Sequence, residues 1–181
     1  MESLRLVVAD DHDIVRRGLR DLLEQHIGWR VVAEAADGKE AVQKVLNANP
    51  DVAVLDFQMP VVNGLEAARQ IAKRGLKTRI LVLTMHESDT LVREMLDAGV
   101  RGYILKSDAA RDLASAVEAL RYNRTFFSAH IQEMVLDGYL KTMKKPADTE
   151  SSASRLTPRQ RDVLKLFAEG KTSGEAAAVT A

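Results

Sequence analysis

The chain has 181 residues, of which 46% are hydrophobic and 29% charged, and it contains no cysteine. Disulfide bonds and thiolate metal sites are therefore excluded, and a formal net charge of zero gives no overall field that would attract nucleic acid or a membrane. No apolar run approaches the roughly 20 residues that cross a bilayer, and the first residues lack a signal-peptide pattern. We therefore expect a cytoplasmic protein with no membrane partner.

Short apolar segments alternate with segments of helical periodicity between residues 4 and 121. Strands are expected at 4–9, 30–36, 52–56, 80–84 and 103–105, and helices around 14–23, 41–46, 65–72, 91–96 and 113–120. Asp11 or Asp13 is expected to cap the first helix, and Gly99 to end the fourth. This alternation predicts an α/β fold, a doubly wound sheet of five parallel strands with helices on both faces.

The pattern changes beyond residue 121. Residues 128–143 have helical spacing, whereas residues 144–155 contain no large apolar side chain and read as a flexible linker. A further helix is expected to begin at Thr157, which would form a capping box with Gln160. These observations divide the chain into an α/β domain at 1–122, a helical segment and linker at 123–154, and an all-α segment at 155–181.

Polar side chains end four of the five predicted strands: Asp10 and Asp11, Asp56, Thr84, and Lys106. Each has an ordinary explanation when it is taken alone, such as a helix cap or a solvated lysine. With the strand order 2-1-3-4-5, however, all five lie around one pocket at the carboxyl edge of the sheet, where ligands of open α/β sheets bind. Their joint placement therefore indicates a site.

The charges of this pocket favour a divalent cation. Three carboxylates and one ammonium sum to about −2 at neutral pH, which is unstable without a cation or bound protons. Oxygen ligands favour Mg²⁺. We expect Asp11 and Asp56 to bind the metal directly, Asp10 to act through water, and the backbone carbonyl of Gln58 to complete the protein's share.

A pocket with this chemistry can receive a phosphoryl group. The Asp56 carboxylate is the expected nucleophile, which would become an aspartyl phosphate. Lys106 and Mg²⁺ would neutralise the phosphoryl oxygens, and the Thr84 hydroxyl would donate a hydrogen bond to one of them.

These residues resemble the receiver domain of bacterial two-component response regulators, over about residues 4–121. The residues that carry the resemblance are Asp10-Asp11, Asp56 followed by Met59-Pro60, Thr84, Tyr103 and Lys106. The resemblance implies a flavodoxin-like fold and phosphotransfer from a sensor histidine kinase to Asp56, with slow dephosphorylation rather than enzymatic turnover. It also implies a switch in which Thr84 moves toward the phosphoryl group and Tyr103 turns inward.

A second resemblance lies near the end of the chain. Residues 156–164, followed by 169–172, resemble the opening of a LuxR-type helix-turn-helix domain, so the whole chain is similar to the NarL/FixJ class of transcriptional regulators. Residues 155–181 lack the scaffold and recognition helices of that domain, and a recognition helix is what reads bases in the major groove. The printed chain is therefore expected to hold an incomplete DNA-binding domain.

The sequence is compatible with two functional outputs of the phosphorylated protein. One is control of transcription; the other is a receiver that acts only through protein contacts. The resemblance also implies a phosphorylation-dependent homodimer formed through the fourth helix, fifth strand and fifth helix. Leu91, Val100 and Ile104 are candidates for its surface, although their spacing fits core positions equally well.

Two other α/β classes use parts of the same chemistry. A haloacid-dehalogenase-type enzyme needs a second acid two residues after its nucleophile, and Gln58 occupies that position. A flavin carrier needs a loop that holds phosphate after the first strand, where the acidic residues 10–13 would repel an anion. Both are disfavoured. Gln58 and His86 are instead expected to lie near the path of attacking water and to tune the lifetime of the phosphoryl group.

Overall fold

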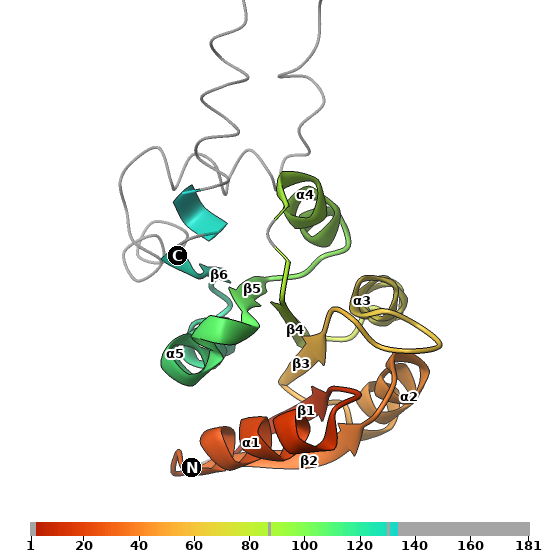
Figure 1. The fold of residues 1–181 in the computed structure, drawn as a ribbon. Helices are drawn as coiled ribbons and strands as arrows, with labels where there is room; N and C mark the ends of the chain where they lie inside the picture. Colours follow the sequence, from red (N-terminus) through yellow and green to blue (C-terminus); the bar gives the residue numbers. More distant parts are fainter. Residues whose placement is uncertain (1–2, 87, 130, 134–181) are drawn as a thin grey trace, which may run out of the picture.

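A computed structural model of the chain describes residues 3–86, 88–129 and 131–133 (Figure 1). The predicted linker at 144–155 and the helix expected to begin at Thr157 lie outside the described residues. Within the described part of the chain, none of the helices has both the length and the apolar character that crossing a membrane requires.

Strands and helices alternate along the described chain, as the sequence predicts. The strands are β1 (Leu4–Ala9), β2 (Trp29–Ala35), β3 (Val52–Asp56), β4 (Arg79–Thr84), β5 (Gly102–Leu105) and β6 (Phe126–Phe127). The helices are α1 (Asp13–Glu24), α2 (Gly38–Ala48), α3 (Gly64–Lys73), α4 (Asp89–Asp97) and α5 (Ala109–Arg121), with a short 3₁₀ turn, η1 (Lys106–Asp108), before α5.

The strands form one parallel sheet in the order β2-β1-β3-β4-β5-β6. The predicted order of the first five strands is confirmed. The sixth strand was not predicted: Phe126 pairs with Gly102, and Phe127 with Tyr103, at the outer side of β5. A strand of two residues is too short to show a periodic pattern of apolar residues in the sequence.

Helices cover both faces of the sheet, with α1 and α5 on one face and α2, α3 and α4 on the other (Figure 1). The central strand β3 is buried along its whole length. Its residues alternate, so Val54 packs with the side chains of α1 and α5, and Leu55 with those of α2, α3 and α4. Burial on both faces explains why the strand is a continuous apolar run, and it fixes Asp56 at the central carboxyl edge.

The loop that follows β3 packs closely against the backbone of Asp56. Asn63 caps α3 by accepting a hydrogen bond from the Glu66 amide at 2.8 Å. A Cβ atom on the next residue, Gly64, would lie 2.2 Å from the carbonyl oxygen of Asp56. Only glycine allows this approach, so the Asn63-Gly64 pair positions the loop beside the end of β3.

The start of α1 differs from the prediction. The expected side-chain cap from Asp11 or Asp13 is wrong, because the N-cap residue is His12, and its side chain makes no cap hydrogen bond. The Asp11 carboxylate instead lies 2.8 Å from His12 Nδ1, and Asp13 lies in the first turn and pairs with Arg16. Both carboxylates that could have capped the helix therefore contact neighbouring side chains instead. Gly99, by contrast, has the predicted left-handed conformation, with φ of 88°.

Two of the candidate dimer residues belong to the core. Val100 is 4% exposed and Ile104 is fully buried, so neither can contribute to an exposed face. Leu91 is half-buried and packs against the core that includes α4. Their apolar character is explained by packing inside the fold.

Candidate functional site

The carboxyl ends of four strands bring together the polar residues that the sequence singled out. Asp10 directly follows β1, Asp56 and Thr84 are the last residues of β3 and β4, and Lys106 directly follows β5. The Lys106 ammonium lies 2.8 Å from Oδ2 of Asp10 and 2.7 Å from Oδ2 of Asp56. Asp10, Asp56 and Thr84 are nearly or fully buried. The carboxyl edge of the sheet thus brings together the predicted nucleophile Asp56, its neighbour Asp10 and the ammonium of Lys106.

The acidic side chains form a cluster that fits a divalent cation. Asp10, Asp11, His12 and Asp56 each offer one ligand atom, and these atoms all lie within 4.8 Å of one another. Three of the four donors are carboxylate oxygens, which are the ligands that Mg²⁺ prefers. The cluster therefore has the donors to hold a metal ion. His12 was not predicted here, although its place directly after Asp10-Asp11 in the sequence could have indicated it.

Burial and charge together set the protonation of the pocket. Burial raises the pKa of Asp56, and the nearby Asp10 carboxylate adds to this, while the hydrogen bond and charge of Lys106 oppose it. Burial alone would lower the pKa of Lys106, but its hydrogen bonds to Asp10 and Asp56 and their charges outweigh that effect and raise it. Lys106 is therefore a persistent cation, shared by two buried carboxylates.

Gln58 reaches the site through both its backbone and its side chain. Its amide donates a hydrogen bond to Oδ1 of Asp56 at 3.3 Å. Its side-chain Nε2 lies 2.9 Å from Nε2 of His86, which follows β4. The two residues that we expected near the path of attacking water therefore contact each other beside Asp56, whereas the metal contact of the Gln58 carbonyl stays a prediction.

The backbone of His86 connects the two predicted switch residues. The Thr84 hydroxyl accepts a hydrogen bond from the His86 amide at 3.0 Å and donates to the His86 carbonyl oxygen at 3.3 Å. The fully buried Tyr103 donates its hydroxyl to the same oxygen at 3.2 Å. The inward orientation of Tyr103, expected for the phosphorylated form, is thus the one in this structure. The shared oxygen was missed because a sequence does not reveal where a loop carbonyl points.

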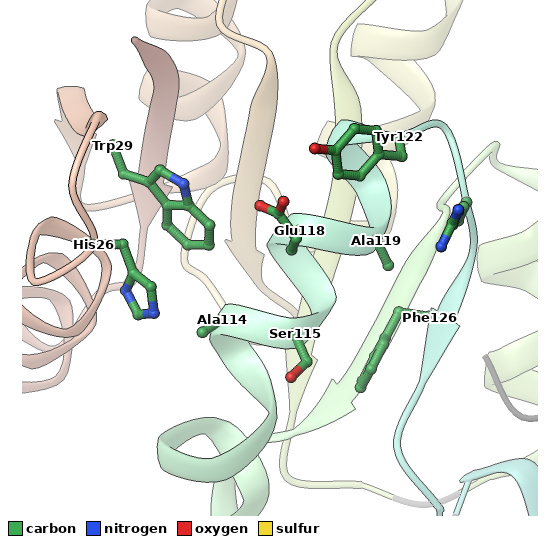
Figure 2. A pocket seen from close by; sticks show the side chains of 9 residues that line it. His26, Trp29, Ala114, Ser115, Glu118, Ala119, Tyr122 and Phe126 are labelled. Atoms are coloured by element: carbon green, nitrogen blue, oxygen red, sulfur yellow. The ribbon is translucent and has the colours of Figure 1, made fainter. Parts of the chain in front are cut away.

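A separate cavity lies at the opposite, amino edge of the sheet (Figure 2). It has a volume of about 510 Å³, and the residues that begin β2 and β6, Trp29 and Phe126, line it together with the C-terminal half of α5. The rings of His26 and Trp29 stack there at 4.5 Å between centroids. Because parallel strands start at this edge, the cavity is distinct from the acidic cluster.

Comparison with known proteins identifies the family. Residues 6–118 match the model of the response regulator receiver domain. The chain is 31% identical over 173 residues to the response regulator UvrY of Escherichia coli K12, in an alignment that covers 95% of this chain and 77% of UvrY. It is 33% identical over 172 residues to the transcriptional regulatory protein LiaR of Bacillus subtilis 168, covering 95% of this chain and 80% of LiaR.

A solved structure gives the same result. A LuxR-family two-component response regulator from Aurantimonas sp. SI85-9A1 has a TM-score of 0.74 and 36% sequence identity, covering 77% of this chain and 99% of that one. These relatives favour a regulator of transcription over a receiver that acts only through protein contacts. Members of the family are typically not turnover enzymes. The chain belongs to the two-component response regulators of the NarL/FixJ class, with its receiver domain at residues 6–118.

Proposed function

We propose that Asp56 accepts a phosphoryl group from a sensor histidine kinase, and that the modified receiver controls transcription. The observation that carries this proposal is the position of the Lys106 ammonium, which lies within hydrogen-bond distance of both Asp10 and Asp56. A nucleophilic carboxylate, a fixed cation and an acidic cluster in one pocket are the parts that phosphoryl transfer requires.

In the proposed step, an oxygen of Asp56 attacks the phosphorus of a phosphohistidine. The new P–O bond forms as the P–N bond breaks, and the imidazole leaves with the bonding electron pair and takes a proton from water. Lys106 is placed to neutralise one phosphoryl oxygen. The Thr84 hydroxyl can donate to another once it releases the carbonyl oxygen of His86.

The acidic residues prepare the pocket for this step. We propose that Asp11 and Asp56 hold Mg²⁺ directly, with Asp10 acting through water and the Gln58 carbonyl as a further ligand; the cluster of carboxylate oxygens supports this assignment. When bound, the metal neutralises charge on the transferred group. Gln58 occupies the position at which a phosphatase of this type has its general acid. We therefore expect the aspartyl phosphate to persist rather than to be hydrolysed rapidly.

The proposed output follows from the organisation of the chain. We propose a receiver at 1–122, a helical segment and linker at 123–154, and the beginning of a LuxR-type DNA-binding domain at 155–181. The alignments with UvrY and LiaR, which extend over 95% of this chain, support this division. Operator binding by the protein produced from its native gene, compared with and without phosphorylation, tests the output; unchanged binding would leave signalling through protein contacts.

The phosphorylation proposal is tested by incubating the whole chain with acetyl phosphate and MgCl₂ and measuring its intact mass. The wild-type chain is expected to gain the mass of one phosphoryl group, and EDTA is expected to prevent this gain. Asp56→Asn is expected to abolish it. Asp51→Asn, which changes an aspartate just before the opposite end of the same strand, is the matched control and is expected to react normally. An unchanged mass gain in Asp56→Asn would contradict the assignment.

A further inference from the structure

The side chain of Arg16, on α1, contacts the backbone that joins the two acidic residues Asp10 and Asp11. Its Nη1 donates a hydrogen bond of 2.7 Å to the carbonyl oxygen of Asp10. That carbonyl belongs to the peptide group between Asp10 and Asp11, which is planar. The orientation of this one peptide group therefore constrains the backbone from which both carboxylates project.

Arg16 is itself held in place from two further elements. Its guanidinium pairs with Asp13 in the first turn of α1, and its Nε lies 3.4 Å from Oε2 of Glu34 on β2. The side chain is only 14% exposed. A planar guanidinium with several partners has a fixed orientation, unlike the flexible ammonium of a lysine. Arg16 thus links α1, β2 and the acidic loop through one rigid group.

The other contacts of Asp10 show why its hydrogen bond from Arg16 matters. Its carboxylate oxygens accept hydrogen bonds from the His12 amide at 2.9 Å and from Lys106 at 2.8 Å. Those are the oxygens that a cation or its water ligands would contact. The two backbone contacts, the Asp10 amide to the Ala35 carbonyl at 3.2 Å and the Asp10 carbonyl to Arg16, use no carboxylate oxygen. They can therefore hold Asp10 in place whatever the carboxylate binds.

We propose that Arg16 is a positioning residue for the divalent-cation site: it fixes the Asp10–Asp11 peptide group so that the acidic cluster is ordered before the cation arrives. This inference rests on the proposed function, because it takes the cluster as the cation site. Two effects of Arg16 have opposite signs. Its positive charge repels a cation, so removal of the charge alone would tighten binding, whereas loss of the positioning contact would weaken it.

Arg20 provides the matched control. It lies one turn further along α1, and its Nη1 contacts Oε1 of Glu34 at 2.9 Å, so it shares one partner with Arg16. It reaches Glu34 and Asp21 rather than the acidic loop. Arg20→Gln therefore removes a similar charge and a contact to β2 without changing the hydrogen bond to Asp10.

The test is calorimetric titration of the whole chain with MgCl₂, for wild type, Arg16→Gln, Arg16→Lys and Arg20→Gln. Arg16→Gln is expected to weaken Mg²⁺ binding about tenfold, the lower end of the range for contacts that orient metal ligands. Arg16→Lys, which keeps the charge and one donor group, is expected to recover part of this loss. Arg20→Gln is expected to bind Mg²⁺ at least as tightly as the wild type does, because it removes a positive charge and leaves the hydrogen bond to Asp10 in place. Thermal unfolding in EDTA measures the loss of stability separately.

The outcomes separate this inference from the proposal on which it rests. Mg²⁺ binding by Arg16→Gln that equals or exceeds that of the wild type would overturn the inference alone, as would an equal loss in Arg20→Gln. If Arg16→Gln does not fold, Arg16→Lys decides: an affinity below that of the wild type, which carries the same charge, supports the inference, and an equal affinity overturns it. A wild-type chain that binds no Mg²⁺ would contradict the proposed function itself.

Discussion

The Lys106 ammonium lies 2.7 Å from Oδ2 of Asp56, in a pocket where the Asp56 side chain is 3% exposed. This contact does not fully compensate for burial, which raises the pKa of Asp56 despite the hydrogen bond and charge of Lys106. Ionised Asp56 therefore lowers the stability of the fold, and it does so at the position where a reactive carboxylate is needed.

We expect Asp56→Asn to stabilise the chain when no Mg²⁺ is present. A carboxyl group whose folded-state pKa is raised contributes stability at low pH, and this contribution is lost as pH rises through the folded-state pKa. At neutral pH the wild type therefore carries a penalty that the amide does not. Thermal unfolding in EDTA at pH 7.5 should show a melting temperature a few degrees higher for Asp56→Asn, since about 1 kcal/mol corresponds to roughly 2–4 °C in a chain of this size.

Two controls accompany this prediction. The difference in melting temperature between Asp56→Asn and the wild type should decrease as the pH is lowered through the carboxyl range, because the wild-type carboxylate becomes protonated. Saturating MgCl₂ should shrink it as well, because the metal favours the carboxylate. A melting temperature of Asp56→Asn below that of the wild type in EDTA would show that the contact with Lys106 outweighs burial.

Lys106→Met is expected to destabilise the chain by about 3 kcal/mol at neutral pH in EDTA, because it leaves buried carboxylates without their cation. The pKa of Lys106 is raised by its partners, so its ammonium contributes fully at neutral pH and is lost only in the strongly alkaline range. Urea unfolding measures the effect, with the exposed Lys39→Met as control. Adding Asp56→Asn should restore more stability than the same change adds to the wild type; an additive double variant would show that the two residues are not coupled.

The sequence was sufficient for the framework of this site. The parallel sheet could be predicted because apolar strands alternate with amphipathic helices, whereas its strand order is the one that the resemblance to receiver domains implies. The site could be predicted because each polar residue lies at the end of a strand. Contacts made by the backbone could not be predicted. The hydrogen bond from Arg16 to the Asp10 carbonyl and the bonds from Thr84 and Tyr103 to the His86 carbonyl depend on loop geometry, which residue spacing does not encode.

We expect Gln58 and His86 to lengthen the lifetime of the aspartyl phosphate as a pair. Their side-chain nitrogens lie 2.9 Å apart, and the Gln58 amide contacts Asp56. Replacing either side chain with alanine admits water beside the carboxylate, so dephosphorylation should become faster. The loss of phosphoryl mass over time, measured after removal of the donor, gives the rate.

The paired geometry makes a sharper prediction for the double variant. If the contact between Gln58 and His86 is what excludes water, Gln58→Ala, His86→Ala and the double variant should all lose the phosphoryl group at similar rates. If the increases in dephosphorylation rate from the two single variants multiply in the double variant, the two side chains act independently. Rates equal to that of the wild type in all three would remove both residues from control of the lifetime.

Two glycine substitutions test whether the site depends on the close approach of the loop after β3. Gly64→Ala should lower stability by more than 1 kcal/mol and slow phosphorylation, because its Cβ atom would lie 2.2 Å from the Asp56 carbonyl oxygen and displace it.

Gly18→Ala is the control, since a Cβ atom there meets nothing within 4 Å. That change in the middle of α1 should raise stability by up to about 1 kcal/mol. Urea unfolding and the acetyl phosphate reaction measure both effects; normal phosphorylation by Gly64→Ala would show that the loop can move away without disturbing Asp56.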